Sequence, residues 1–181
     1  RAALLRLARS AIEAKLTEGA EVQRPDMVSP TLKELRGCFV TIHKQGQLRG
    51  CIGTIEPSYP LIEGVEKNAQ NAAFRDQRFK PLRAEELKEI DIEVSVLTVP
   101  EALAFTDGED LKGKLVPNVD GVILSRGGHR STFLPQVWAQ LPDKEQFLQR
   151  LCIKGGMSAQ AWQNPETKVQ VYQAEVFGEK D

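Results

Sequence analysis

The segment Leu48–Thr54 carries the residues best suited to chemistry, because it places one cysteine, Cys51, between Gly50 and Gly53. Glycine weakens a strand, so these glycines predict a bend or the close approach of another group. The neighbouring cation Arg49 would favour the thiolate, which is the nucleophilic form of cysteine. The sequence therefore offers Cys51 as a candidate nucleophile with Arg49 as its electrostatic partner. The alternative is a small, half-buried cysteine that fills space.

Two β-type runs, residues 37–43 and 48–55, flank a short turn and predict a β-hairpin. A two-residue loop would mix apolar and polar side chains on both faces, whereas a three-residue loop separates them, so we expect the latter. The expected pairs are Lys44 with Leu48, Ile42 with Gly50, and Val40 with Ile52. One face then carries Val40, Ile42, Leu48 and Ile52, and the other carries Thr41, His43, Arg49 and Cys51. His43 would lie opposite Arg49 and diagonal to Cys51 as a candidate base, or else be a solvated residue near the turn.

A second group of polar residues follows a predicted helix over residues 61–74. Its slim alanine face would let another backbone approach closely. Beyond it, the guanidinium of Arg78 could hold a carboxylate or phosphate through its fork of donors, with Asp76 beside it. In the alternative interpretation, Asp76 and Arg78 tie down the loop while Phe79 packs into the core. Basic residues gather along the same segment: Arg75, Arg78, Lys80 and Arg83.

A third candidate is Lys154, which precedes a Gly-Gly pair and could bring a cation and exposed backbone N–H groups to an anion. An ordinary helix stop explains the same residues. Trp138 and Trp162 are expected to anchor the core or an interface between lobes. The candidate catalytic residues are therefore Cys51 and His43. The candidate ligand-binding residues are Arg49, Gly50, Gly53, Thr54, Asp76, Arg78 and Lys154.

Composition excludes several classes of protein. The 181 residues are 41% hydrophobic and 27% charged with a net charge of −1, which argues against a general nucleic-acid binder. No apolar run approaches the roughly 20 residues that span a bilayer. Three cysteines without CxxC spacing, and two histidines, fit a reducing cytoplasm better than a disulfide scaffold or a zinc site. The first residue is Arg1 rather than Met, so the start is expected to be trimmed or processed.

Periodicity predicts the same order of elements twice: helix, hairpin, helix, strand. The first half reads as a helix over 1–18, a loop over 20–31, the hairpin, the helix over 61–74, a helical turn over 83–89 and a strand over 90–98. The second half reads as a short helix over 107–114, strands over 122–125 and 130–134, a helix over 143–154 and a strand over 168–177. We expect an α+β fold with antiparallel or mixed sheets flanked by helices. The whole chain would be one domain with two lobes, about 1–100 and 101–181, sharing a cleft.

Several segments together resemble the AMMECR domain family, known in prokaryotes as AmmeMemoRadiSam system protein A. They are GCFVT at 37–41, LRGCIGT at 48–54, DQRF at 76–79, IEVSVLT at 92–98, TFLPQV at 132–137 and LCIKGG at 151–156. The chain departs from the pattern at Gln77, where many relatives have proline, and this should only loosen that turn. The resemblance supplies no settled activity. It implies a role beside a Memo-type protein and a radical S-adenosylmethionine protein, whose CxxxCxxC motif this chain lacks.

Two hypotheses remain open. In the first, the protein is an enzyme or enzyme subunit that uses Cys51 on a small anionic substrate, alongside the Memo-type and radical S-adenosylmethionine partners. In the second, it is a non-catalytic module that binds a ligand or those partners, and Cys51 is inert. A third interpretation, nucleic-acid binding by the basic residues 75–83, is disfavoured by the neutral overall charge. We expect no metal, no cofactor and no membrane association.

Overall fold

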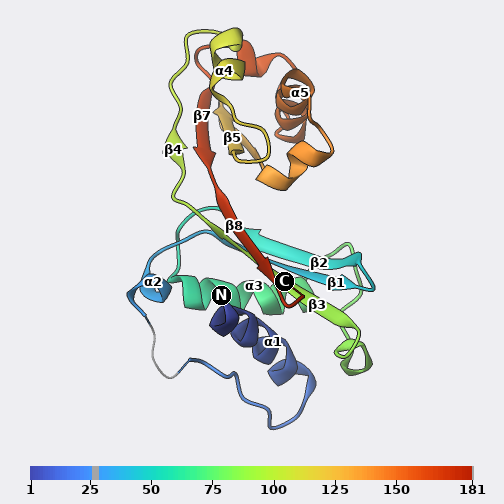
Figure 1. Ribbon diagram of the computed structural model, residues 1–181. Helices are drawn as coiled ribbons and strands as arrows, with labels where there is room; N and C mark the ends of the chain where they lie inside the picture. The colour runs from blue at the N-terminus through green and yellow to red at the C-terminus, as the bar shows by residue number, and fades with distance from the viewer. Residues whose placement is uncertain (26–28, 181) are drawn as a thin grey trace. The chain divides into compact units, whose positions relative to one another are not determined.

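The computed structural model describes residues 1–25 and 29–180, and within them the chain divides into two compact units. The first unit contains residues 1–99 and the C-terminal residues from Glu175 onward, and the second is Pro100–Ala174. Each unit has its own sheet, helices and hydrophobic core (Figure 1). Residues 26–28 of the predicted loop lie outside the described residues.

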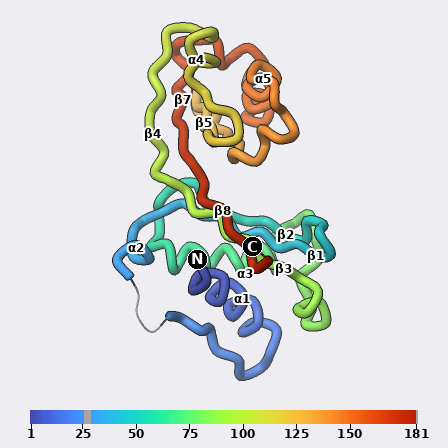
Figure 2. Tube along the Cα trace, viewed as in Figure 1, coloured from blue at the N-terminus to red at the C-terminus, as the bar shows by residue number. Residues whose placement is uncertain are grey.

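The sheet of the first unit has the strand order β2-β1-β3-β8. Helices α1 and α3 pack against one face of it and against each other, as the traces in Figures 1 and 2 show. Among the described residues, no helix of this unit packs on the other face of the sheet. The elements of the unit are α1 (Ala2–Leu16), α2 (Pro30–Lys33), β1 (Cys38–Lys44), β2 (Gln47–Thr54), α3 (Leu61–Phe74), the 3-10 turn η1 (Ala84–Glu86), β3 (Ile90–Leu97) and β8 (Ala174–Gly178).

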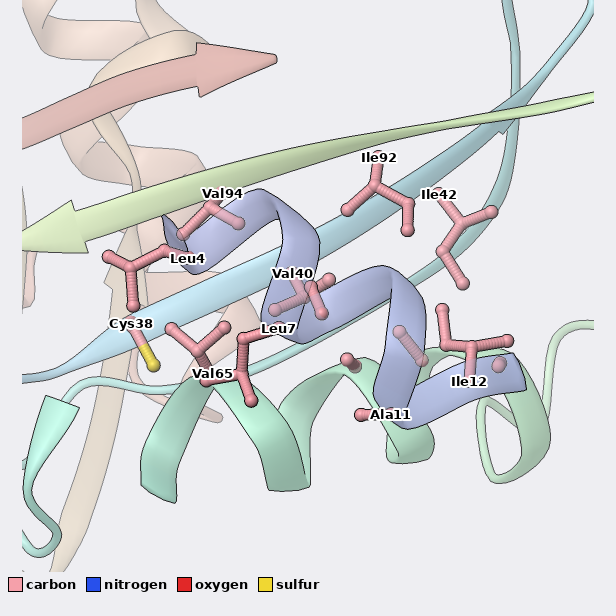
Figure 3. Packing of buried hydrophobic residues seen from close by; sticks show 14 of the residues in the cluster. Leu4, Leu7, Ala11, Ile12, Cys38, Val40, Ile42, Val65, Ile92 and Val94 are labelled. Carbon is pink, nitrogen blue, oxygen red and sulfur yellow. The ribbon is translucent and has the colours of Figure 1, made fainter. Parts of the chain in front are cut away.

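Alternation along β1 and β3 builds the core of this unit. Val40 and Val94 are directly paired across the two strands, and both are completely buried. Figure 3 shows these side chains, with those of their strand neighbours Ile42 and Ile92, directed toward α1. Helix α1 contributes apolar residues at helical spacing, among them Leu7, to the same core cluster. Because successive strand residues point to opposite faces, the odd-numbered residues of β1 and β3 lie on the other face.

The sheet of the second unit has the strand order β4-β7-β5-β6. Its core includes both tryptophans, with the rings of Trp138 and Phe147 stacked at 3.6 Å between centroids. Asp107 and Asp143 cap the two α-helices by accepting a backbone N–H. The elements are β4 (Glu101–Ala102), α4 (Gly108–Lys114), β5 (Gly121–Arg126), β6 (His129–Phe133), the 3-10 turn η2 (Pro135–Ala139), α5 (Lys144–Lys154), the 3-10 turn η3 (Ala161–Gln163) and β7 (Lys168–Tyr172).

The predicted α+β fold is confirmed, and the described strands form antiparallel sheets covered by helices. One expected element is wrong: the strand predicted over 168–177 is two strands, β7 and β8, separated at Gln173. They belong to different sheets, yet the alternation of residues continues through the break and gives no signal of it. The short elements α2, β4 and η3 were not predicted.

Candidate functional site around Cys51

The hairpin that carries Cys51 ends in a two-residue turn, so the predicted three-residue loop is wrong. Gln45 and Gly46 form the turn, both at positive φ (53° and 78°), as hairpin turns that match the strand twist require. Lys44 pairs with Gln47 and His43 with Leu48, and a bulge at Arg49 then restores the expected register. From Ile42–Gly50 onward the predicted pairs hold. Leu48 therefore leaves the core face and is 43% exposed.

The Cys51 thiol lies on the sheet face opposite the helices, beside Thr41. The two residues are directly paired across β1 and β2, and the Thr41 hydroxyl donates to Cys51 Sγ at 3.3 Å. The thiol is partly exposed, whereas Cys38 and Cys152 are completely buried. Burial raises the pKa of the Cys38 thiol to about 11 and raises that of Cys152 as well. Of the three cysteines, Cys51 is thus the one placed to react.

The backbone of Cys51 is held from outside the sheet by the loop that follows α3. Strand β2 is at an edge, so the amide and carbonyl of Cys51 point away from β1. Asp76 Oδ2 accepts the Cys51 N–H at 2.9 Å, and Arg78 Nη2 donates to the Cys51 carbonyl at 3.2 Å. These two side chains bond the backbone N–H and carbonyl of Cys51, with which a further strand could otherwise pair.

Asp76 and Arg78 also bind each other. Arg78 Nε donates to Asp76 Oδ1 at 2.9 Å and Nη2 donates to Oδ2 at 2.7 Å, in the bidentate geometry of a guanidinium with a carboxylate. Asp76 is buried, and its hydrogen bonds with Arg78 hold the pKa of its carboxyl far below the ordinary value. The Arg78 side chain is 57% exposed and lies near the Phe79 ring, which is only partly buried. In this ion pair the Arg78 guanidinium is exposed to solvent and the Asp76 carboxylate is buried.

The glycines of the segment are places of close approach. A Cβ on Gly50 would lie 2.2 Å from the carbonyl oxygen of Ala72, so α3 packs directly on the strand backbone there. A Cβ on Gly53 would lie 2.2 Å from the ring of Phe39. Both approaches use the room that glycine leaves. Thr54 pairs with Cys38, which places it in the row of the core face and away from the thiol.

The described hydrogen bonds of the Arg49 side chain are with Glu86 and not with Cys51, the partner that the sequence suggested. The Arg49 side chain leaves the bulge and donates from Nε and Nη2 to Glu86 at 3.1 and 3.0 Å. Glu86 also accepts from Lys44 Nζ at 3.3 Å and from the Arg83 amide at 3.1 Å. Its side chain is only 9% exposed, and the hydrogen bonds from Arg49 are the main reason that its pKa falls to about 2. This cluster fixes the turn η1 against the hairpin.

The remaining candidates are not brought to the thiol by any described contact. His43 lies opposite Leu48 on one side and Asp91 on the other, not opposite Arg49, because the bulge shifts the pairing. His43 still lies on the thiol face, two residues along β1 from Thr41. Lys154 belongs to the second unit, where its Nζ donates to the Thr132 carbonyl at 2.7 Å and burial lowers its pKa.

Sequence reasoning missed two carboxylates. Glu86 comes from a segment predicted only as a helical turn, and nothing in the sequence indicated that it would bind Arg49. Glu93 pairs directly with Thr41 across β1 and β3, so the side chains of Cys51, Thr41 and Glu93 form one row on the thiol face. The strand over 90–98 was predicted, and Glu93 lies in it between the buried Ile92 and Val94, but the sequence did not indicate the neighbouring strand. Across residues 1–25 and 29–180, no cluster of His, Cys, Asp and Glu side chains could hold a metal ion.

The fold and the hairpin together define an α+β domain of two sheet-and-helix units with a partly exposed cysteine on an edge strand. The family model described as AMMECR1 matches residues 5–177. A protein of Methanothermobacter thermautotrophicus is 42% identical over 177 residues, 97% of this chain and 92% of that one. A protein of Thermococcus gammatolerans is 42% identical over 185 residues, 98% of this chain and 89% of that one.

A solved structure agrees with these sequence matches. The crystal structure of the uncharacterized protein PH0010 from Pyrococcus horikoshii superimposes with a TM-score of 0.88 at 39% identity, covering 98% of this chain and 90% of that one. The chain belongs to the AMMECR1 family, which confirms the resemblance drawn from the sequence. In the described part of the chain, no helix is long and apolar enough to cross a membrane.

Proposed function

We propose that this AMMECR1-family domain performs a cysteine-dependent reaction on a small anionic substrate, with Cys51 as the nucleophile. The observation that carries the proposal is the setting of the thiol. It is partly exposed, it receives a hydrogen bond from Thr41 at 3.3 Å, and its own backbone is held by Asp76 and Arg78. A fixed backbone and a hydroxyl donor at sulfur both suit a group that must meet a substrate in one orientation.

Arg78 supports the anionic character of the substrate. Its guanidinium carries donors in a fixed fork, and the two atoms that bind Asp76 and the Cys51 carbonyl are Nε and Nη2. The exposed remainder can receive a carboxylate or phosphate oxygen at the edge of β2. Both Arg49 and Arg78 were expected from the sequence as candidate anion-binding residues, and Arg49 is paired with Glu86. The proposal therefore assigns the anion to Arg78.

In the reaction, the Cys51 sulfur forms a bond to an electrophilic carbon of the substrate while the bond from that carbon to a leaving group breaks. The leaving group departs with the electron pair of the broken bond, and the thiol proton passes to solvent or to His43. The proposal also includes the partners that the family resemblance implies. The domain would act alone or as a subunit beside a Memo-type protein and a radical S-adenosylmethionine protein. Purified partners can then be added to the same assay, and an effect on Cys51 reactivity would support the association.

The test compares alkylation of the native protein by iodoacetate, which is anionic, and by iodoacetamide, which is neutral. Mass spectrometry reports each cysteine separately, and the urea-unfolded protein gives the intrinsic rate for each reagent. We expect Cys51 to react in the native state while the buried Cys38 and Cys152 do not. We also expect iodoacetate to be favoured at Cys51 relative to the unfolded chain, and Arg78→Gln to remove that preference. If Cys51 reacts only on unfolding, the nucleophile role is wrong.

A second candidate function is a non-catalytic module that binds a ligand or the same partners. It is favoured by one observation: Asp76 and Arg78 each use one hydrogen bond to close the edge of β2 and the others to hold each other, which is a structural task. The variants Cys51→Ser and Cys51→Ala separate the two functions. Incubated with a fractionated pool of anionic metabolites, both variants should lose any turnover that the wild type shows if Cys51 is catalytic. Turnover by wild type and variants alike would contradict catalysis by Cys51.

A further inference from the structure

The row of side chains that contains the thiol continues beyond it to a carboxylate. Cys51, Thr41 and Glu93 are direct partners across β2, β1 and β3, so their side chains project from the same face. The hydrogen bond from Thr41 to Cys51 shows that neighbours in this row meet. Glu93 is partly exposed, and its side chain makes no hydrogen bond or ion pair with any described residue. Its charge is therefore available to a ligand.

The two ends of the row differ in charge. At the edge of β2, Asp76 is buried and Arg78 is exposed, so the surface there is cationic. Two strands further in, Glu93 gives an anionic surface. The adjacent carboxylate on this face, Asp91, is already paired with Lys180 and does not add to it. Adjacent strands are about 4.8 Å apart, so Glu93 lies about 10 Å from Cys51 along the row. Arg78 lies on the opposite side of Cys51, beyond the edge of β2, where it binds the Cys51 carbonyl.

Resting on the proposed function, we infer that the substrate of Cys51 carries two opposite charges. Its anionic group binds Arg78 at the edge of β2, and an ammonium or other N–H donor binds Glu93, about 10 Å from the thiol. The electrophilic carbon lies between the two groups, over the Cys51 sulfur. A purely anionic molecule of this length would place negative charge against Glu93, which selects against it. Glu93 is thus a specificity-determining residue, and the substrate class is a small zwitterion.

The test uses methanethiosulfonate reagents that differ in charge: a neutral methyl, an anionic sulfonatoethyl and a cationic trimethylammonioethyl compound. Each forms a disulfide with Cys51, and methanesulfinate leaves with the electron pair of the broken S–S bond. Rates at Cys51 are measured at low ionic strength, where exposed charges act over the full length of the row. Dividing by the neutral rate removes any change in the reactivity of the thiol itself.

We expect Glu93→Gln to lower the ratio of cationic to anionic rates by about two- to fourfold, the effect of one charge at this distance in a largely aqueous setting. Arg78→Gln should raise the same ratio by a similar factor. Glu63→Gln is the matched control, because Glu63 is an exposed carboxylate on α3, on the other side of the sheet, and should leave the ratio unchanged. Glu93→Lys should reverse the preference, and circular dichroism verifies the fold of each variant.

The outcomes separate the inference from the proposed function. The inference of a zwitterionic substrate is overturned if Glu93→Gln and Glu63→Gln give the same ratio of cationic to anionic rates while Cys51 still reacts with the neutral reagent. That result leaves the cysteine-dependent reaction in place. A Cys51 that the neutral reagent does not reach in the folded wild type overturns both.

Discussion

Replacing Glu86 by glutamine should destabilise the first unit in a way that depends on pH. Glu86 is almost fully buried and accepts hydrogen bonds from Arg49, Lys44 and the Arg83 amide. The main cause of its depressed pKa is the hydrogen bonding to Arg49, which lowers it from 4.5 to about 2. That difference corresponds to about 3 kcal/mol of stability at neutral pH as an upper value. Glutamine keeps the volume but leaves Arg49 without a counter-charge, so we expect a loss of about 2–4 kcal/mol.

The sign of the pH dependence follows from the direction of the shift. Because the folded-state pKa of Glu86 is depressed, its contribution is fully present above about pH 4.5 and is lost as the pH falls toward about 2. The wild type should lose about 1 kcal/mol from this group near pH 4 and about 2 kcal/mol near pH 3. The variant has no carboxyl to protonate there. The stability difference between the two proteins should therefore shrink on acidification.

The assay is urea unfolding followed by far-ultraviolet circular dichroism at several pH values. Fluorescence is unsuitable, since Trp138 and Trp162 both belong to the second unit. Glu85→Gln is the matched control, because its side chain is 79% exposed and lies 4.0 Å from Arg83. We expect it to change stability by less than about 0.5 kcal/mol. A Glu86→Gln difference that stays constant from neutral to acid pH would refute the linkage argument.

Three further predictions address the hairpin and its support. Gly50→Ala should cost about 1–3 kcal/mol in urea unfolding, because its Cβ would lie 2.2 Å from the Ala72 carbonyl oxygen. Gly113→Ala, in open space on α4, should be neutral or slightly stabilising in the same assay. Asp76→Asn should cost about 2–3 kcal/mol at neutral pH, less on acidification below the ordinary carboxyl pKa of 3.8, and an unchanged pH profile would contradict this. Thr41→Val should slow iodoacetamide labelling of Cys51 severalfold, since it removes the donor at 3.3 Å from sulfur, and an equal rate would show that this hydrogen bond has no effect.

The sequence predicted the elements well wherever local pattern decides the structure. Helix α3 has the predicted bounds, and the strand over 90–98 differs from β3 by one residue, because the apolar spacing of each is unambiguous. The tip of the hairpin was missed for an energetic reason. A bulge at Arg49 lets the chain use a favourable two-residue turn and still bury Val40 and Ile42, and a bulge leaves no mark in the alternation.

The candidate site was predictable in its centre and not in its surroundings. Cys51, Thr41 and His43 were expected on one face, and they lie there. The contacts of Arg49 with Glu86, and of Asp76 with the Cys51 amide, join segments 37 and 25 residues apart. Such contacts depend on how elements pack, and no spacing within either segment encodes them.

The break at Gln173 has a consequence for how the protein is made. The first unit is interrupted by the whole of the second, so its edge strand β8 is synthesised after the second unit. Arg1, which precedes α1, and Arg9 within it pair with Glu175 and Glu179, which are synthesised 174 and 170 residues later. The first unit cannot complete its sheet on the ribosome until the second unit has emerged. The second unit, by contrast, is continuous and can fold as it appears, so it is the first of the two to be finished although it begins later.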